Sequence, residues 1–465
     1  MNHYRYLAAA LAALATPAAA QSLTSTETAQ IDTLVTGALA KTGTPSASIA
    51  IVRGGRIVLA KAYGRASDAI PVAQPDLPYQ IASISKQFTA AAILLLEDEG
   101  KLSLNDTVSK YVPDISGGDT ITIRQLLSHT AGLQDYWPQD YSFAAMAKPT
   151  SPQGIVDIWG KKPLDFAPGS QWQYSNTGYV VAGLIVEKVA GEPLLAFLQS
   201  RIFKPLGMTP IDQDLAVGAK YPVGYQRFAL GPVRVEQPAA SGWLFAAGEL
   251  SMTASDLAKW DVARMNRSLL PADDWTAQET PVKLADGTTN GYGLGVSAAT
   301  VAGRKLVTHD GEAVGFLSQN TVYPEEKAAI VVLTNADFGD AYTSIAAGIA
   351  KIVLPAAPVD AAETAKTAQA HALFDQFAAG TLDRGLLTAD ANYYFTPIAL
   401  SDYHASLGAL GAPKGFEPLR GPRLRGGFVN RNYKVTYADR TLNIVTYAEP
   451  GDTGKYEQFL VMPAN

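Results

Sequence analysis

The chain has 465 residues, of which 47% are hydrophobic, and it carries a formal net charge of -6. This hydrophobic content over this length exceeds what one core usually absorbs, so the sequence predicts two domains. The mild negative charge, without a basic block, argues against nucleic acid as a partner. The absence of cysteine excludes disulfides, thiol nucleophiles and cysteine-based metal sites. Because no HExxH pair is present either, we expect neither a metal nor a cofactor.

The N-terminal segment has the pattern of a secretory signal peptide. Arg5 gives a positive n-region, residues 7–15 form a short apolar run, and small residues precede a cleavage point before Gln21. The alternative is a membrane anchor, but the run is shorter than the roughly 20 residues that a bilayer needs, and Pro17 interrupts it. We therefore expect removal of residues 1–20, a periplasmic or secreted protein, and no stable membrane insertion.

Residues 21–355 are predicted to form one α+β domain. We expect a β-hairpin over residues 44–64 with a turn at Gly54 and Gly55, then a buried helix over residues 83–99 and a region of mixed helices and loops to about residue 259. Four short strands follow, over residues 291–298, 304–311, 316–324 and 327–335, and a final helix covers residues 342–353. In this order the N- and C-terminal segments share one antiparallel sheet with flanking helices, and a helical region is inserted between them.

Residues 356–465 are predicted to hold a linker and a C-terminal α+β accessory domain. We expect a helix over residues 361–379, with Asp360 and Glu363 as a capping box, a short helix over residues 400–407, and an antiparallel meander. This order of elements resembles an NTF2-like or lipocalin-like fold, and such a resemblance implies no function. A basic cluster here is either a solvated surface or a contact for an anionic wall polymer or for the catalytic domain: Lys414, Arg420, Arg423, Arg425 and Arg431.

Ser83 and Lys86 form a Ser-x-x-Lys motif at the start of the predicted buried helix. Residues three apart share one helix face, and apolar surroundings disfavour the charged form of a lysine. A neutral amine can take the serine proton, and the helix N-terminus favours negative charge on the oxygen. The alternative is an ordinary N-terminal serine followed by a surface lysine.

Tyr174 and Asn176 precede a second apolar helix. A tyrosine here could pass a proton to a leaving group if cationic neighbours lowered its pKa from near 10. Asn176 offers a donor and an acceptor, which suits binding a substrate amide. In the alternative, Tyr174 only packs and Asn176 caps the helix.

His309, Asp310 and Gly311 end a predicted strand. Gly311 has no side chain, so a substrate backbone could lie against this edge. The backbone N–H of Glu312 could pair with that of Ser83 as an oxyanion hole. The alternative is a strand end with a solvent-facing histidine.

Ser-x-x-Lys, Tyr-x-Asn and His-x-Gly, in this order, resemble the motifs of the penicillin-recognising serine hydrolases. That superfamily includes class C β-lactamases, D,D-carboxypeptidases, D-aminopeptidases and related esterases. The resemblance covers residues 31–354, and further segments share it: "LLSHTAGL" at 126–133, "FAAGELSMTASDLAKW" at 245–260 and "YGLGV" at 292–296. It implies a β-lactamase/D,D-peptidase-like fold for this part of the chain.

The resemblance also implies roles for the matched residues. Ser83 would be the acylated nucleophile and Lys86 its base, and Tyr174 would move protons to the leaving group and help to activate the deacylating water. Asn176 would bind the substrate amide, and His309 stands where many members have a lysine. Asp310 departs from the usual threonine or glycine, and could turn outward or weaken the binding of anionic substrates.

The expected function is that of an exported serine hydrolase acting through an acyl-enzyme on D-amino-acid-containing peptides or related amides and esters. It would be D,D-carboxypeptidase-like or D-aminopeptidase-like; the alternatives are a β-lactamase or esterase of the same fold, or a catalytically silent binding protein. The aromatic loop 134–143 could wall the cleft or simply pack, and His129 is expected to anchor structure. A G-x-S-x-G nucleophile elbow is absent, which disfavours a conventional α/β-hydrolase.

Overall fold

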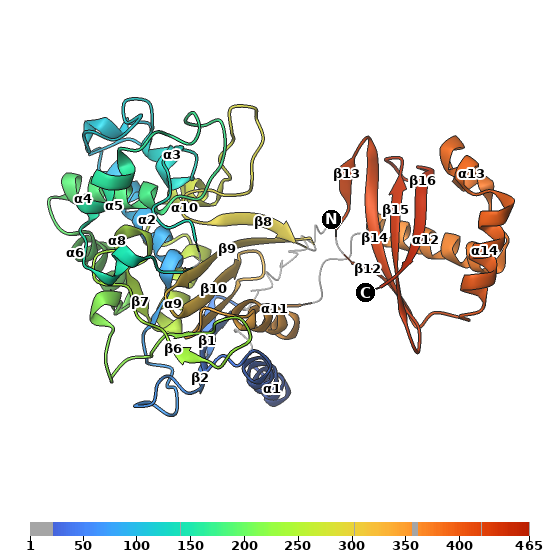
Figure 1. Ribbon diagram of the computed structural model, residues 1–465, viewed down its shortest axis with the longest axis horizontal. Coiled ribbons are helices and arrows are strands. Elements are labelled where there is room, and N and C mark those ends of the chain that lie inside the picture. Colours follow the sequence, from blue (N-terminus) through green and yellow to red (C-terminus); the bar gives the residue numbers. More distant parts are fainter. Residues whose placement is uncertain (1–21, 140, 302, 356–360, 420, 465) are drawn as a thin grey trace, which may run out of the picture. The chain divides into compact units, whose positions relative to one another are not determined.

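The computed structural model describes residues 22–139, 141–301, 303–355, 361–419 and 421–464 (Figure 1). The predicted signal peptide and Asp360 of the predicted capping box lie outside these residues. Contacts divide the described residues into two compact units, of which the first holds residues 22–299 and 305–355. The second holds residues 300, 301, 303 and 304 and the described residues from 361 onward.

The first unit is built on a six-stranded sheet with the strand order β2-β1-β11-β10-β9-β8. The strands are β1 (Ser46–Arg53), β2 (Arg56–Gly64), β8 (Ser297–Val301), β9 (Arg304–Ala313), β10 (Phe316–Tyr323) and β11 (Ala328–Thr334). Strand β1 pairs antiparallel with both β2 and β11, so the two ends of this unit meet in one sheet. The predicted hairpin and the predicted shared sheet are both confirmed.

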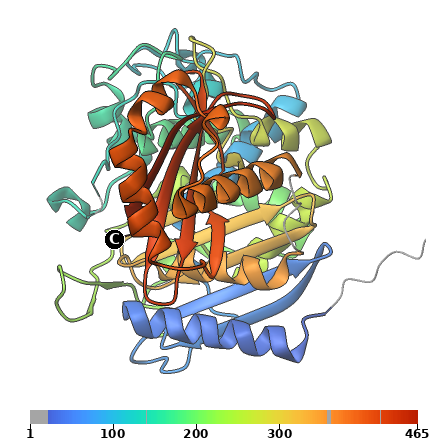
Figure 2. The same cartoon turned by 90° about the vertical axis from the view of Figure 1, so that its right-hand side faces the viewer.

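Both faces are buried at the centre of this sheet, in β1 and β11, whereas the edge strands β2 and β8 are mostly half-buried or exposed. Successive residues of β1 serve opposite faces. Ile49 and Ile51 pack with α1 (Ser25–Thr42) and α11 (Ala341–Val353), whereas Ala50 belongs to the apolar core on the other face. Helix α1 runs beside the first two strands in both ribbon views (Figures 1 and 2). Helix α9 (Ala254–Met265) covers the second face.

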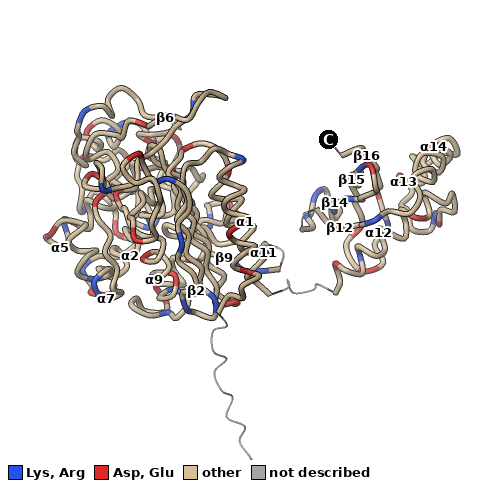
Figure 3. Tube along the Cα trace, turned by 90° about the horizontal axis from the view of Figure 1, so that it is seen from below, with Lys and Arg blue, Asp and Glu red and all other residues tan. Residues whose placement is uncertain are grey.

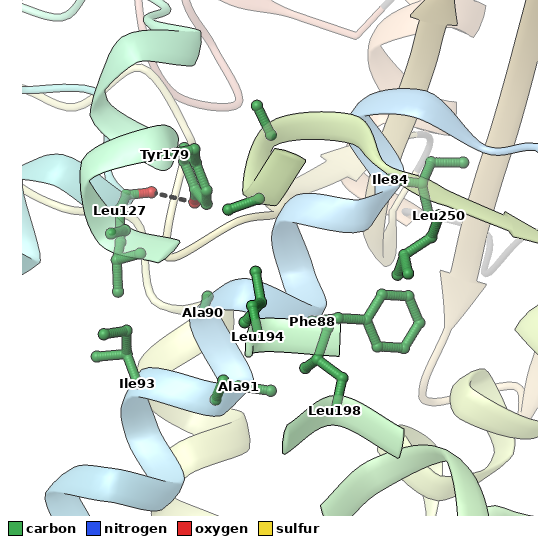
Figure 4. Packing of buried hydrophobic residues seen from close by; sticks show 14 of the residues in the cluster. Ile84, Phe88, Ala90, Ala91, Ile93, Leu127, Tyr179, Leu194, Leu198 and Leu250 are labelled. Carbon is green, nitrogen blue, oxygen red and sulfur yellow. Dashed lines mark hydrogen bonds between the residues drawn. The ribbon is translucent and has the colours of Figure 1, made fainter. Parts of the chain in front are cut away.

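Helix α2 (Lys86–Asp98) forms the centre of the larger core, and its residues from Lys86 to Leu94 are all buried. The chain enters it through a 3-10 turn, Ala82–Ser85, rather than through a continuous helix beginning at Ser83. The ring of Phe88 packs 4.7 Å from that of Trp260, between ring centroids. Figure 4 shows the labelled apolar side chains of α2 among residues of neighbouring helices.

The region between β2 and β8 is a mixture of helices and loops, as predicted. Its other helices are α3 (Ile123–Leu127), α4 (Pro152–Ile155), α5 (Asn176–Ala190), α6 (Leu194–Leu198), α7 (Lys204–Leu206), α8 (Phe245–Gly248) and α10 (Ala272–Glu279). Short strands form two small sheets, one of β3 (Tyr79–Gln80), β7 (Leu250–Met252) and β4 (Ile211–Asp212), the other of β5 (Tyr225–Gln226) and β6 (Arg234–Val235).

The predicted strand over residues 291–298 is largely wrong, because β8 begins only at Ser297. The glycines of this segment bring it against other backbone instead of into the sheet. Gly295 has a φ of +79°, and a Cβ there would lie 2.9 Å from the carbonyl oxygen of Lys86. The segment therefore packs directly on the start of α2, which a side chain would prevent.

The second unit is an antiparallel sheet with helices packed against one face. Its elements are α12 (Ala361–Ala379), α13 (Ala389–Tyr394), α14 (Pro397–Gly408), β12 (Gly415–Pro418), β13 (Arg423–Arg425), β14 (Phe428–Thr436), β15 (Thr441–Ala448) and β16 (Tyr456–Pro463). Buried and partly buried residues alternate along β15, so one face meets the core that the helices complete. An open sheet covered by helices is closer to the NTF2-like alternative, and the identity of this fold stays a prediction.

Charged residues of both signs are interspersed along the two units (Figure 3). The predicted basic cluster of the second unit is partly neutralised, because Arg431 donates to both oxygens of Glu363, at 2.7 and 2.6 Å. Arg425 donates to the hydroxyl of Tyr447 at 3.1 Å. Within the described ranges, no helix is long and apolar enough to cross a bilayer, and no group of His, Asp and Glu residues is arranged to hold a metal ion.

Candidate active site

Ser83 lies in the 3-10 turn that leads into α2. The preceding residue, Ala82, has a φ of +49°, a conformation that costs energy for any residue with a Cβ. The turn is tied to β7, because the backbone N–H of Ile81 donates to the carbonyl of Leu250 at 3.0 Å. Ser83 is half-buried between buried neighbours, and it lines the cleft together with Ala82.

Lys86 begins α2, and its side chain is completely buried. Its Nζ lies 3.0 Å from Ser83 Oγ, 2.8 Å from Asn176 Oδ1 and 2.7 Å from the carbonyl oxygen of Ala247. The structure therefore brings together the serine and lysine of the predicted motif, together with the asparagine of the second motif.

Burial lowers the pKa of Lys86 from 10.5 to about 7. The negative charges of Asp135 and Asp310 oppose this shift without cancelling it. A large share of the Lys86 side chains is therefore uncharged at neutral pH, which is the form able to accept a proton.

Tyr174 lies against the same amine, with its ring centroid 4.9 Å from Lys86 Nζ. Burial raises the pKa of this phenol well above 10, and a hydrogen bond with Ser83 only partly opposes the rise. The condition considered from the sequence, that cationic neighbours lower this pKa, is not met. Tyr174 is consequently protonated in the resting site and is poised to give a proton rather than to take one.

Asn176 is the first residue of α5, and Ser175 caps the helix by accepting from the N–H of Gly178. Ser175, not Asn176, therefore caps this helix, so the alternative in which Asn176 is only a helix cap is wrong. Its Oδ1 faces Lys86, while its Nδ2 donates to Asp135 at 3.3 Å.

Asp135 is a site residue that the sequence argument missed, because the loop 134–143 was judged only by its aromatic residues. Its Oδ1 accepts from the backbone N–H groups of Trp137, at 3.1 Å, and of Asn176, at 3.0 Å. Burial raises its pKa. No local pattern marks Asp135, because it follows the polar Gln134 and its partner Asn176 lies 41 residues further along the chain.

His309 is buried and uncharged. Burial lowers its pKa to about 4. Its Nδ1 lies against the carbonyl oxygen of Asp310, which can only accept, so Nδ1 carries the ring hydrogen. Its Nε2 then accepts from the hydroxyl of Tyr292 at 2.8 Å. His309 therefore brings no positive charge to the cleft, unlike a lysine at this place.

Asp310 and Glu312 are exposed residues that alternate along β9 with the buried His309, Gly311 and Ala313. Side chains of successive strand residues leave on opposite sides, so the carboxylate of Asp310 is directed away from the imidazole of His309. The side chain of Asp310 is exposed, but Asp310 still lines the cavity over Ser83, so its carboxylate remains at the cleft.

Gly311 allows β9 to approach the turn that carries Ser83. A Cβ on Gly311 would lie 2.1 Å from the carbonyl oxygen of Ile81 and 2.3 Å from Ser318 Oγ. Ser318 donates to that same carbonyl at 3.0 Å, which links β10 to the turn. Ser83 and Glu312 line one cavity, and their pairing as an oxyanion hole stays a prediction.

The cavity over Ser83 has a volume of about 940 Å³. Residues of the aromatic loop form part of its wall, among them Trp137 and Tyr141. The carboxyl-bearing residues that line it outnumber the cationic residue Arg227; they are Asp135, Glu236, Asp310, Glu312 and Asp337.

His129 lies beneath the site rather than in it. Its ring centroid is 4.1 Å from that of Tyr174 and 4.8 Å from that of Tyr292. Its Nδ1 accepts from the backbone N–H of Ser175 at 3.1 Å, and burial lowers its pKa well below 6.5. These contacts agree with the expected structural role, because they hold Tyr174 and the start of α5 in place.

Known proteins resemble this chain in sequence and in structure. The family model described as Beta-lactamase matches residues 31–353. Protein flp of Staphylococcus aureus is 32% identical over 326 residues, covering 67% of this chain and 64% of flp, so the chain matches less than two thirds of that relative. A D-stereospecific amidohydrolase from Streptomyces sp. is 28% identical, with a TM-score of 0.60, over 68% of this chain and 96% of that one. A penicillin binding protein from Bacillus halodurans is 26% identical, with a TM-score of 0.58, over 67% and 97%.

The approach of β9 to the serine turn gives a direct prediction. Gly311→Ala places a methyl group in contact with backbone, so we expect a loss on the order of 1–3 kcal/mol in the free energy of unfolding and a severe loss of reactivity at Ser83. Thermal melts and labelling by a serine-directed probe measure the two effects. Gly37→Ala in α1 is the matched control, because a Cβ there meets nothing within 4 Å. Normal labelling of Gly311→Ala would show that the close approach is not required.

Proposed function

Because the chain belongs to the beta-lactamase family of serine hydrolases, we propose that it is an exported enzyme that cleaves amides or esters of D-amino acids and D-peptides through an acyl-enzyme on Ser83. The observation that carries the proposal is the set of three oxygen atoms around Lys86 Nζ. Export rests on the signal-peptide pattern of residues 1–20.

The three contacts determine where a neutral Lys86 directs its lone pair. A neutral amine has two N–H groups and one lone pair. The carbonyl oxygens of Ala247 and Asn176 can only accept, so they take the two N–H groups. The lone pair then faces the Ser83 hydroxyl, which can donate. The Ser83 proton moves to Lys86 Nζ as Oγ bonds to the substrate carbonyl carbon.

Tyr174 completes the proton path. When the tetrahedral intermediate collapses, the phenol gives its proton to the leaving nitrogen or oxygen and receives the proton that Lys86 holds. This returns Lys86 to the neutral form and leaves an ester on Ser83. Water then attacks the ester, with the same groups moving a proton in the opposite sense. The support for this role is the protonated state of Tyr174 and its contacts with Ser83 and Lys86.

The charges of the cleft narrow the substrate class. A substrate with a carboxylate beside the scissile bond, such as a D-alanyl-D-alanine peptide or a penicillin, needs a cation there, and His309 is neutral. Carboxyl-bearing residues dominate the cavity wall. Amides and peptides with a free ammonium group suit this potential better. This favours the D-aminopeptidase-like alternative over the D,D-carboxypeptidase-like and β-lactamase alternatives, and the name of the Streptomyces relative supports it.

The nucleophile and base are tested by intact-mass spectrometry after exposure to D-alanyl peptides, D-amino-acid esters and penicillins. We expect acyl adducts on the wild-type chain, none on Ser83→Ala, and acylation slowed by about 10²–10⁴-fold in Lys86→Met, since the base is lost. The catalytically silent alternative predicts no adduct with any of these compounds. Equal acylation of Lys86→Met and wild type would remove the lysine from the mechanism.

The pKa of Lys86 predicts the pH dependence of acylation. Only the neutral amine accepts the proton, and its fraction grows as the pH rises through the pKa of about 7. The acylation rate constant should therefore increase with pH, with a midpoint near 7, and level off above it. Single-turnover measurements across this range provide the test. A rate constant that falls as the pH rises through neutrality would contradict the assignment.

The charge argument predicts a substrate preference. D-Phenylalanine amide, which carries an ammonium group, should have a kcat/KM at least about tenfold higher than an N-acetylated D-alanyl-D-alanine, which carries a carboxylate. The preference should shrink as salt screens the cleft, because the acidic residues act over a distance. A higher kcat/KM for the acidic peptide at low salt would exclude this preference and favour a carboxypeptidase.

A further inference from the structure

Asp135 makes no contact with Lys86 or Ser83 among the described hydrogen bonds, yet it holds the residue that contacts Lys86. Its Oδ2 accepts from Asn176 Nδ2 at 3.3 Å, and its Oδ1 accepts from the backbone N–H of Asn176 at 3.0 Å. The backbone N–H of Trp137 adds a third bond, at 3.1 Å. Together these bonds fix the carboxylate at the first turn of α5, where the helix leaves N–H groups without intrahelical partners and favours negative charge.

The side-chain amide of Asn176 has nearly the same shape in two orientations that exchange its oxygen and its nitrogen. A carboxylate can only accept, so Asp135 requires the NH2 group of Asn176 to face it. The Oδ1 atom must then face Lys86, where it lies 2.8 Å from Nζ. The direction of the amide is thus set by Asp135, which binds Nδ2 of Asn176 while Oδ1 faces Lys86.

We propose that Asp135 is a positioning residue that, through Asn176, directs the lone pair of Lys86 at Ser83. The proposal rests on the proposed role of Lys86 as the base. When Oδ1 of Asn176 faces Lys86, the neutral amine donates one N–H to Asn176 and the other to the carbonyl of Ala247. In the reversed orientation Nδ2 donates to Lys86, which occupies the lone pair and leaves an N–H directed at Ser83. The lone pair of Lys86 is then blocked, and Ser83 loses its base.

Asp135 also acts on Lys86 through its charge. The carboxylates of Asp135 and Asp310 raise the pKa of Lys86 against the effect of burial. The other titratable groups that face this amine are all uncharged at neutral pH, because burial lowers the pKa of each imidazole and raises that of each phenol: His129, His309, Tyr174 and Tyr179. Removing the charge of Asp135 therefore moves the pKa of Lys86 down, whereas loss of positioning lowers the rate at every pH.

The test is the rate of Ser83 modification by a fluorophosphonate, followed by intact mass across pH. In this reaction the Ser83 Oγ–P bond forms, the P–F bond breaks, fluoride leaves, and the serine proton passes to Lys86. No deacylation step follows. For Asp135→Asn we expect kinact at the high-pH plateau to fall on the order of 10²-fold, KI to stay within about twofold, and the pH midpoint to move below that of wild type.

Three further variants distinguish positioning from a structural defect. Asp135→Glu keeps an acceptor-only group and should recover part of kinact. Asn176→Asp places a carboxylate beside Lys86 and should move the midpoint up, opposite to Asp135→Asn, because a negative neighbour favours the ammonium form. Gln134→Ala is the matched control in the same loop, since its side chain donates to the carbonyl of Pro163, and it should leave kinact unchanged.

The outcomes separate this proposal from the proposed function. If the wild-type chain forms no Ser83 adduct, the proposed function is wrong, and the role of Asp135 falls with it. If wild type reacts and Asp135→Asn reacts with the same kinact and the same pH midpoint, only the positioning role is wrong. A loss confined to KI also overturns it, because that result assigns Asp135 to ligand binding. A last outcome is that Asp135→Asn lowers the melting temperature and that Asp135→Glu restores neither kinact nor the pH midpoint. That result would assign Asp135 a structural role and would likewise overturn the proposal.

Discussion

The site depends on one amine that is excluded from water and surrounded by three oxygen atoms. Lys86 Nζ lies 2.7 to 3.0 Å from the carbonyl of Ala247, the amide oxygen of Asn176 and the hydroxyl of Ser83. Two of these atoms can only accept, and the third can both accept and donate. As an ammonium, Lys86 donates to all three; as a neutral amine, it donates to two and accepts from Ser83. Both protonation states are satisfied without any movement of heavy atoms.

This arrangement is costly to bury, and the fold supports it from several sides. The start of α2 is held by backbone packing at Gly295, and the serine turn is held by β9 at Gly311, so neither segment can shift without a clash. The neighbouring groups remain uncharged: His309 has a pKa of about 4, and Tyr174 one well above 10. A second cation next to Lys86 would lower its pKa further, and a closer carboxylate would restore its charge. The pKa near neutrality reflects this balance.

The sequence was sufficient for those parts of the fold that depend on local pattern. The hairpin, the buried helix and the strands β9 to β11 follow from periodicity and turn residues, and the Ser83–Lys86 contact follows from a spacing of three on one helical face. The segment 291–298 was misjudged because its glycines pack against other backbone, which a strand pattern does not reveal. The protonation states of Tyr174 and His309 could not be predicted from the sequence either, because burial by distant segments of the chain sets their pKa values. Asp135 was missed because its partner Asn176 is 41 residues away in the chain, and only the fold brings the two together.

The most direct test of this account is an NMR titration of Lys86 itself, with the lysine side chains labelled with carbon-13 at Cε and the signal assigned by its absence in Lys86→Met. Such a titration reports the charge of the amine without any substrate or chemical step. A midpoint near 7 is the predicted result, more than two pH units below that of an ordinary lysine. A side chain that stays charged up to a pH of about 10 would contradict the claim that Ser83 is activated by a neutral amine.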